Sequence, residues 1–431
     1  MVTDTVIKKG YKQTELGLIP EDWEVKNIED LTPPGKKFGI VDGPFGSNLK
    51  TIHYRKSGIP IITSGYVTDG KFFAPEYLYV DIEKFKQERR SAVRGGDIVM
   101  AKIGERCGAS AILPKDHSES ILSGNALKIS IDENKFSTEL IAQILWRHHT
   151  IGNLELLRTI GAQPAISMAN LKKYKIPIPA TKLEQTAIAT VFSDTDALIE
   201  HLEELITKKK AIKQGTMQIL LTGKKRLPGF TGKWEEKILK KMIQIPVTDG
   251  PHLTPRFLQE GIPFLSVNNL NNNKIDYSDL RYISRKDHEE FSKKCKPQKN
   301  DILLGKAASV GLVALVETDL EFNIWSPIAL IRLNKEYIPK FVYYLFSTKA
   351  TSDQIKLLTN SSSQGNIGMC DIEKLNFLVP SKEEQAGIAT IFSDMDTEIE
   401  NLEQKRDKYI MIKKGMMQQL LTGKIRIYGN N

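Results

Sequence analysis

The chain has 431 residues, of which 40% are hydrophobic, and its formal net charge at pH 7 is +9. A chain of this length is too long for one compact core, so two or more domains are expected. Three widely spaced cysteines without a CxxC pair argue against a disulfide or zinc scaffold. The first residues have no apolar run of signal-peptide length, and no stretch of about 18 apolar residues occurs, so a cytoplasmic protein that does not span a membrane is expected. The basic balance favours nucleic acid as a partner.

The first half of the chain predicts short strands with a few helices. "GIPIITSGYV" (residues 58–67) and "GDIVMAK" (residues 96–102) are strand-like runs bounded by Gly and Asp. "TELIAQILWRHH" (residues 138–149) has helical spacing of apolar residues. Pro177 and Pro179 end this domain before a long helix, and Gly223 is placed as its C-terminal cap.

The second half repeats the first. "IATVFSDTDALIE" (residues 188–200) returns as "IATIFSDMDTEIE" (residues 388–400), and both helices end in "LLTGK". "GDIVMAK" is matched by "NDILLGK" (residues 300–306), and "VDGPF" (residues 41–45) by "TDGPH" (residues 248–252). The separation between matching residues drifts from 200 to about 211, so loop lengths vary while the frame is kept.

The two long helices carry an apolar seam. Its spacing of 3 and 4 residues is of heptad type, and Gly215 and Gly415 are expected to interrupt the helix ends. Two related seams predict an antiparallel pair, although two unrelated surface helices would be the simpler alternative. The seam residues are Phe192, Thr195, Ile199, Leu202, Ile206, Ile212 and Leu220 in the first copy, and Phe392, Met395, Ile399, Leu402, Arg406, Tyr409, Ile412, Met416 and Leu420 in the second.

The sequence therefore predicts an α+β protein in which two domains are each followed by a long helix. The two helices are expected to pack as an antiparallel coiled coil with pseudo-two-fold symmetry. The predicted divisions are residues 1–181 for the first domain, 182–222 for the first helix, 223–380 for the second domain, and 381–431 for the second helix and the C-terminal tail.

The matched strands and helices are similar in the two halves, but the loops between them differ. These loops are rich in side chains that hydrogen-bond phosphates and base edges. Two readers of two different DNA words are therefore predicted. Any single loop residue can instead be structural, since Asn favours turns and a lysine at a strand end is often simply solvated. The candidate DNA-binding residues are Ser47, Asn48, Lys50, His53, Ser64, Tyr66, Lys102, Glu105, Arg106, Asn125 and Gln163 in the first half, and His252, Thr254, Arg256, Asn268, Asn269, Lys306, Ser309, Asn323, Gln364 and Asn366 in the second.

No catalytic or metal-binding motif is found. The chain lacks GxxxxGK[ST], GxGxxG and HExxH patterns, and the adjacent His148 and His149 cannot share one helix face. "EDWEVK" (residues 21–26) resembles a nuclease element, but its counterpart "KWEEK" indicates that Trp23 and Trp234 anchor a first strand. The carboxylates of Asp194, Asp196 and their copies are explained as first-turn residues that favour the helix dipole. A binding protein without catalysis of its own is predicted.

Four stretches carry a family resemblance that covers almost the whole chain: "TELGLIPEDWEV" (residues 14–25), "IPIPATKLEQTAIATVFSDTDALIE" (residues 176–200), "VPSKEEQAGIATIFSDMDTEIE" (residues 379–400) and "LLTGKIRI" (residues 420–427). In these stretches the chain resembles the DNA-specificity subunits of Type I restriction–modification systems. The resemblance implies two target recognition domains that read a bipartite asymmetric DNA site, and helices that set the unread spacer.

The resemblance also implies partners and cofactors. Two copies of a methyltransferase subunit are expected to dock at Phe192, Asp194, Phe392 and Asp394, and motor–nuclease restriction subunits join them in a prokaryotic cytoplasm. The partners would use S-adenosylmethionine, ATP and Mg²⁺, and this chain would hold no cofactor or metal. Two rival hypotheses are a coiled-coil scaffold that binds no DNA and a self-sufficient modification enzyme.

Overall fold

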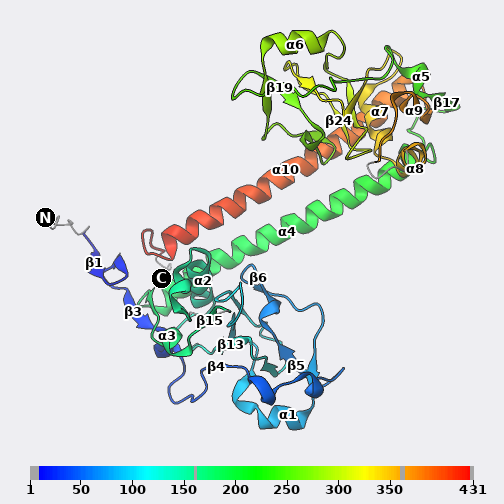
Figure 1. The fold of residues 1–431 in the computed structure, drawn as a ribbon. Coiled ribbons are helices and arrows are strands. Elements are labelled where there is room, and N and C mark those ends of the chain that lie inside the picture. Colours follow the sequence, from blue (N-terminus) through cyan, green and yellow to red (C-terminus); the bar gives the residue numbers. More distant parts are fainter. Residues whose placement is uncertain (1–8, 160–162, 360–364, 428–431) are drawn as a thin grey trace. The chain divides into compact units, whose positions relative to one another are not determined.

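The computed structural model describes residues 9–159, 163–359 and 365–427 (Figure 1). The chain divides into two compact units, of which the first is made of two separate stretches of sequence and the second of one continuous stretch. Unit 1 comprises residues 1–201 and 405–431, and unit 2 comprises residues 202–404.

Unit 1 is built on two four-stranded sheets. The first has the order β11-β10-β13-β4, and all its pairings are antiparallel. The second has the order β8-β5-β12-β9, in which β5 and β12 run parallel. The strands of the first sheet are β4 (Ile40–Asp42), β10 (Ile98–Ala101), β11 (Ser110–Ile112) and β13 (Ala126–Ile129), and those of the second are β5 (Ile59–Ile62), β8 (Tyr79–Val80), β9 (Ala92–Val93) and β12 (Ser120–Leu122).

Smaller elements surround these sheets. The strand β10 is buried at every position, so the first sheet is covered on both faces. The remaining strands of unit 1 are β1 (Tyr11–Thr14), β2 (Gly17–Pro20), β3 (Glu24–Asn27), β6 (Val67–Thr68), β7 (Lys71–Phe72), β14 (Arg158–Thr159), β15 (Ala165–Ile166) and β16 (Lys175–Ile178), and its short helices are α1 (Ile82–Gln87), α2 (Thr138–Thr150) and α3 (Met168–Lys172).

Unit 2 repeats this plan. Its sheet β18-β26-β23-β24 corresponds to the first sheet of unit 1, and β22-β19-β25 corresponds to the second. Its strands are β17 (Glu235–Ile238), β18 (Thr248–Asp249), β19 (Ile262–Leu265), β20 (Leu270–Asn271), β21 (Lys274–Ile275), β22 (Arg281–Ile283), β23 (Ile302–Gly305), β24 (Val313–Leu315), β25 (Asn323–Ile324), β26 (Ile328–Ile331) and β27 (Asn376–Val379), and its short helices are α5 (Leu239–Met242), α6 (Arg285–Ser292), α7 (Pro339–Phe346), α8 (Lys349–Leu358) and α9 (Met369–Ile372).

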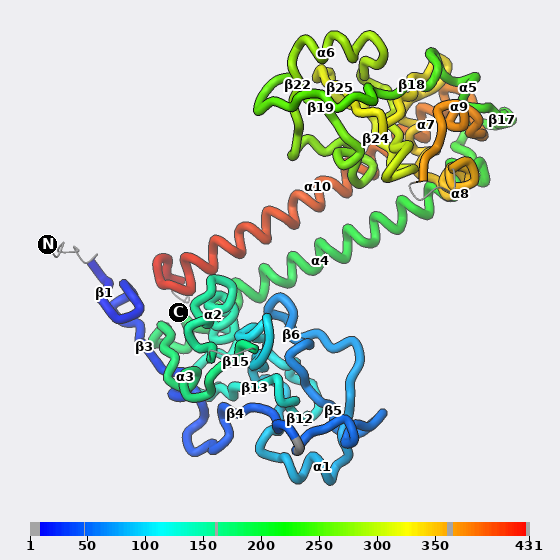
Figure 2. The backbone as a smooth tube through the Cα atoms, viewed as in Figure 1, coloured from blue at the N-terminus to red at the C-terminus, as the bar shows by residue number. Residues whose placement is uncertain are grey.

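Two helices of 39 residues each, α4 (Lys182–Leu220) and α10 (Lys382–Leu420), contribute to both units. Figure 2 follows their backbones without interruption, so Gly215 and Gly415 do not break them, contrary to expectation. The beginning of α4 packs with the end of α10 in the core of unit 1, where Phe192 and Leu420 are buried together. The beginning of α10 packs with the end of α4 in unit 2, where Phe392 and Leu220 are buried together.

Ion pairs fix the register of the two helices within each unit. In unit 1, Lys413 of α10 bonds Asp196 of α4 at 2.6 Å. In unit 2, Lys213 of α4 bonds Asp396 of α10 at 2.5 Å. Residue numbers rise along one helix as they fall along the other, so the pairing is antiparallel in both units, as predicted. The same lysine–aspartate contact is therefore made twice: the lysine comes from α10 in unit 1 and from α4 in unit 2.

An arginine that follows each helix clamps the beginning of the other helix. In unit 1, Arg426 Nε donates to Glu184 at 2.6 Å, and its Nη1 and Nη2 donate to Asp22 at 2.8 Å. In unit 2, Arg226 Nε donates to Glu384 at 2.8 Å, and Trp234 Nε1 donates to the same carboxylate at 3.2 Å. Burial alone raises the pKa of Glu384, but the bonds from Arg226 and Trp234 outweigh it and hold that pKa below its usual range. The hydrogen bond from Arg426 likewise lowers the pKa of Asp22.

The mixed fold, the helix caps and the tryptophan anchors agree with the sequence predictions. Gly223 and Gly423 both have φ of +68°. Trp23 is buried beside β3, which pairs with β16, so the nuclease-like "EDWEVK" is structural. The seam prediction is wrong at Ile212 and Ile412, which are exposed at equivalent positions of the two helices.

The two helix caps differ in their surroundings, and this difference gives a matched test. A methyl group added at Gly423 would lie 2.4 Å from Pro20 Cγ, whereas one added at Gly223 would lie no closer than 3.4 Å to Trp234. Both Gly→Ala variants bear the cost of a left-handed alanine, about 1–2 kcal/mol. We expect Gly423→Ala to lower the thermal unfolding midpoint further than Gly223→Ala, because it also overpacks the site by roughly 1–3 kcal/mol. Equal shifts would contradict the close packing at Gly423.

Candidate nucleic-acid interface

A buried ion pair lies at the end of the central sheet in unit 1. Lys102 follows β10, and its Nζ contacts Asp42 Oδ2, at the end of β4, at 2.6 Å. The Lys102 ammonium also lies 3.9 Å from the centroid of the Phe45 ring. Since Lys102 is buried and already paired with a carboxylate, its prediction as an exposed phosphate contact is corrected.

Unit 2 has the same ion pair. Lys306 follows β23, and its Nζ contacts Asp249 Oδ2 at 3.1 Å. Lys294 Nζ also bonds the Asp249 carboxylate at 2.6 Å, and His252 Nε2 lies 3.5 Å from it. Lys306 is buried like Lys102, so it too is a structural lysine and not the predicted phosphate contact.

The predicted loops of unit 1 gather around this ion pair. Backbone hydrogen bonds join Lys102 to Asn125, Ile166 to Lys102, and Ser123 to Ile62. Gly43 approaches Ser123 so closely that an added Cβ would lie 2.0 Å from its carbonyl oxygen. The loops after β4 and β10 and the loop before β13 therefore meet at one end of the first sheet, and the loop after β5 of the second sheet joins them there.

The loops of unit 2 gather through equivalent bonds. Lys306 N donates to Pro327 O at 2.8 Å, Ile367 N to Lys306 O at 2.9 Å, and Trp325 N to Leu265 O at 2.8 Å. A Cβ on Gly250 would lie 1.7 Å from Ile324 O. The repeated "DGP" thus has a physical cause, since only glycine allows the two loops to touch.

Most of the predicted side chains are brought together on these loops. The ones that are exposed and can reach a ligand are Asn48, Lys50, Glu105, Arg106, Asn125 and Gln163 in unit 1, and His252, Thr254, Arg256, Asn268 and Asn366 in unit 2. Half-buried positions are His53, Ser64, Tyr66 and Ser309. Ser47 lies in the 3-10 turn Gly46–Asn48, and Gln364 lies outside the described residues.

Two predicted asparagines are structural instead. Asn269 is buried, and its side chain accepts from Ser266 N and donates to the carbonyls of Asp276 and Asp279. Asn323 is buried, and its Oδ1 lies 2.7 Å from His288 Nδ1. Both amides have satisfied their hydrogen bonds inside the unit, which removes them from the set of base-reading candidates.

Of the predicted docking residues, two are buried and two are exposed. Phe192 and Phe392 are each 0% exposed and fill the cores of their units, so they cannot contact a partner directly. Asp194 and Asp394 are exposed and stay candidates. Asp196 and Asp396 lie well inside helices that begin at Lys182 and Lys382, so the explanation by first-turn helix dipoles was wrong, and their lysine partners explain them instead.

Two exposed isoleucines were missed as docking candidates. Ile412 precedes Lys413, which bonds Asp196 in unit 1, and Ile212 precedes Lys213, which bonds Asp396 in unit 2. Their exposed fractions are 40% and 46%. Their equivalence could have been found in the sequence, because they lie 200 residues apart, but heptad spacing placed them in the seam.

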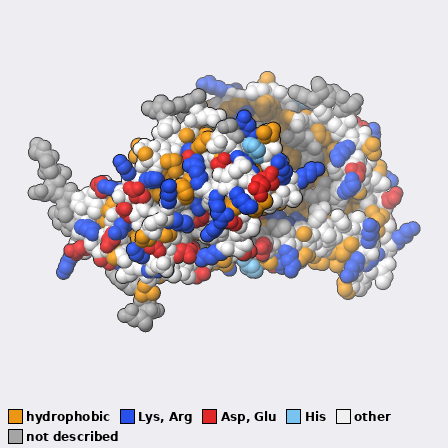
Figure 3. Space-filling model, turned by 90° about the horizontal axis from the view of Figure 1, so that it is seen from below, with side chains coloured by type: hydrophobic (Ala, Val, Ile, Leu, Met, Phe, Trp, Pro, Cys, Tyr) orange, Lys and Arg blue, Asp and Glu red, His pale blue; other side chains and the backbone are white. Residues whose placement is uncertain are grey.

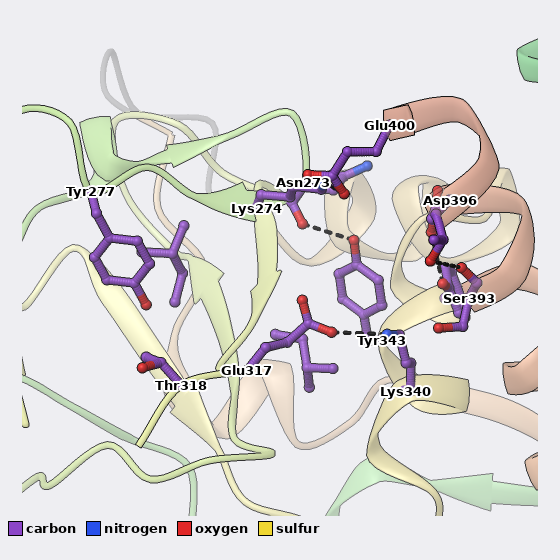
Figure 4. A pocket seen from close by; sticks show the side chains of 14 residues that line it. Asn273, Lys274, Tyr277, Glu317, Thr318, Lys340, Tyr343, Ser393, Asp396 and Glu400 are labelled. Carbon is purple, nitrogen blue, oxygen red and sulfur yellow. Dashed lines mark hydrogen bonds and ion pairs between the residues drawn. The ribbon is translucent and has the colours of Figure 1, made fainter. Parts of the chain in front are cut away.

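A cavity of about 420 Å³ lies in unit 2 between the β20–β21 hairpin, α7 and α10 (Figure 4). Its polar groups bond one another: the Tyr343 hydroxyl donates to the backbone carbonyl of Asn273, and Lys340 Nζ donates to the Glu317 carboxylate. A cavity of about 310 Å³ lies at the equivalent place in unit 1 and is lined by Trp146 and Asp196. Because the polar groups that line the cavity already bond one another, the cavity is better explained as packing between the domain and the long helix than as a ligand site.

No group of three His, Cys, Asp or Glu side chains among the described residues is arranged to hold a metal ion. His148 is buried against the Tyr174 hydroxyl, and burial lowers its pKa to about 4. No helix within the described ranges has the length and apolar character needed to span a bilayer. Lysine and arginine side chains lie among acidic ones over much of the face shown in Figure 3, with hydrophobic side chains exposed between them.

The family model for the Type I restriction modification DNA specificity domain matches residues 20–214 and again residues 232–408. The chain belongs to this family. Two copies of the domain in tandem account for the internal repeat. Membership of this family gives the chain a role in recognising specific DNA. The alternative hypothesis, a scaffold that binds no DNA, is not supported.

Individual relatives match along nearly their whole length. The putative type I restriction enzyme MjaX specificity subunit of Methanocaldococcus jannaschii is 29% identical over 97% of each chain. The EcoKI specificity subunit of Escherichia coli K12 is 23% identical over 95% of this chain and 90% of its own. Among solved structures, the Type I system S subunit from M. genitalium has a TM-score of 0.59 at 15% identity and covers 92% of this chain and 96% of its own, a likeness of fold.

Lys102 and Arg106 lie on one loop and offer a matched comparison. Lys102→Met leaves Asp42 without its buried partner and should cost about 1–3 kcal/mol of unfolding free energy. Arg106→Ala, at an exposed position, should leave stability unchanged, weaken duplex binding, and reduce the salt dependence of log K by roughly one phosphate contact. Thermal unfolding and salt-titrated fluorescence anisotropy measure the two effects. A loss of affinity with full stability in Lys102→Met would restore Lys102 as a phosphate contact.

Proposed function

We propose that the chain reads a bipartite, asymmetric DNA site, with one half-site read by each unit. The support is a constant frame that presents different side chains at equivalent places. Phe45 and His252 both follow "DGP", and Asn125 and Pro327 both accept the same backbone hydrogen bond. Different donors and acceptors on one frame select different base edges.

The two long helices are proposed to set the number of unread base pairs. Each is a rod of roughly 60 Å, since a helix rises about 1.5 Å per residue. Each connects the two units covalently, and the ion pairs fix its register within each unit. A change in helix length should therefore change the spacer and leave the half-sites unchanged.

The exposed isoleucines and aspartates form the proposed docking faces for methyltransferase subunits. Unit 1 offers Asp194 with Ile412, and unit 2 offers Asp394 with Ile212. Two equivalent faces would bind two copies of one partner. In this proposal the chain contributes no catalytic group, and the partners supply S-adenosylmethionine, ATP and Mg²⁺ chemistry.

The first test exchanges one reader. Residues 28–178 are replaced by the equivalent segment of another family member, which keeps Trp23, Asp22 and the Glu184–Arg426 clamp. Methylated adenines are then mapped across the genome of cells that express the complete system. We expect one half-site to change and the other to stay. Changes in both half-sites, or the absence of any bipartite motif for the natural chain, would contradict the proposal.

The second test lengthens the helices. Four residues inserted after residue 204 of α4 and after residue 404 of α10 add about one turn to each helix and leave every ion pair on its own side of the insertion. We expect a longer spacer between unchanged half-sites. An insertion in α4 alone is the control. It should destabilise the protein, because α4 and α10 both connect the two units and would then differ in length. An unchanged spacer in the doubly inserted chain would rule out the spacer role.

The third test addresses docking. Ile212→Glu should remove one methyltransferase copy, and the double variant Ile212→Glu/Ile412→Glu should remove both, because a buried charge is costly at an apolar interface. Native mass spectrometry counts the copies, and anisotropy checks that DNA binding persists. Phe192→Leu, a core substitution, is the control that should retain both copies. Full assembly of the double variant would exclude these faces.

A further inference from the structure

Each unit exposes a leucine at an equivalent position beside its candidate nucleic-acid interface. Leu156 is 85% exposed in unit 1, and Leu357 is 86% exposed in unit 2. They lie 201 residues apart, the same offset that relates Ile166 to Ile367 and Met168 to Met369. A single exposed leucine needs no explanation, but two that recur at equivalent positions do.

The two leucines lie in different helices, Leu156 in the 3-10 helix Asn153–Leu157 and Leu357 in α8, but each follows an equivalent buried anchor. In unit 1, Leu154 packs against Gly108, where an added Cβ would lie 3.3 Å from the Leu154 side chain. In unit 2, Ile355 packs against Gly311, 4.0 Å from the position of an added Cβ. Both glycines have positive φ. Two residues beyond the buried aliphatic anchor, each unit turns a leucine to the outside.

The position of the leucines links them to the predicted loops. Arg158 follows Leu156 by two residues, a span of at most about 7 Å. Its Nη2 donates to the carbonyl of Cys107, next to Arg106. In unit 2, Thr359 follows Leu357 by two residues, and its Cγ2 lies 3.2 Å from the Cβ position of Gly365, next to Asn366. Each leucine therefore lies at the rim of the loops that carry the polar candidates.

We infer that Leu156 and Leu357 are wedges that enter the DNA base stack, one in each half-site; this inference rests on the proposed function. A leucine that touched a thymine methyl group would read sequence, and the two units, which present different polar side chains, would be expected to differ there. A side chain kept in both units fits a contact common to both half-sites. Apolar side chains inserted between base pairs unstack them and bend the duplex.

The test uses the full chain assembled with its partner subunits, without methyl donor, on a duplex that contains the mapped site. Permanganate oxidises unstacked thymines and reports them base by base. The natural chain should give reactive thymines in both half-sites. Leu156→Ala should remove most of the reactivity in one half-site, and Leu357→Ala in the other. Each variant should bind the duplex roughly tenfold more weakly, since a buried leucine side chain is lost. The salt dependence should not change, because no phosphate contact is removed.

Leu320→Ala is the matched control. Leu320 is an exposed leucine of unit 2 on the segment after β24, which leads away from the Lys306 loop. It should leave reactivity and affinity unchanged. The inference is overturned if the natural complex binds without reactive thymines, if reactivity persists in Leu156→Ala and Leu357→Ala, or if these variants lose partner subunits, which would make the leucines protein-docking residues. Failure of the natural complex to bind any mapped duplex would instead reject the proposed function, and the wedge with it.

Discussion

The reciprocal clamp between the two halves of the chain is the interaction on which the rest of the structure depends. Each long helix begins against one domain and ends against the other, where Arg426 holds Glu184 and Arg226 holds Glu384. Glu384 is fully buried and Glu184 nearly so, and a buried carboxylate without its arginine would be strongly destabilising. Each unit is therefore complete only with a segment from the opposite half of the sequence.

This exchange explains which parts of the repeat are kept. The helix sequence is more alike in the two copies than the loops are, because each helix must satisfy two environments, one at either end. The loops face no such double requirement, and only their glycines and the Asp–Lys pair are fixed. Gly43 and Gly250 allow two loops to touch, while Asp42–Lys102 and Asp249–Lys306 neutralise charge where the loops meet. The exposed side chains between these fixed points can vary without cost to the fold.

The sequence predicted the elements better than it predicted the roles of polar side chains. Periodicity and the internal repeat located the helices and the α+β frame, because these depend on local spacing. Lys102, Lys306 and Asn323 were misassigned because their partners come from distant segments, and Asn269 because its amide bonds the backbone of its own loop. Sequence alone does not show which polar groups are satisfied internally. Asp196 illustrates the difficulty, since its partner Lys413 lies 217 residues away.

Burial separates two kinds of repetition that look alike in the sequence. Phe192 and Phe392 recur because each fills a core, so their repetition carries information about folding alone. Ile212 with Ile412, and Leu156 with Leu357, also recur, yet these side chains are exposed to water and are absent from the buried cores of their units. When exposed side chains recur without a role in folding, a binding partner common to both units can be the cause of their recurrence. On the helices we propose that this cause is a methyltransferase partner bound in two copies, and at the loop rims that it is a feature shared by the two proposed DNA half-sites.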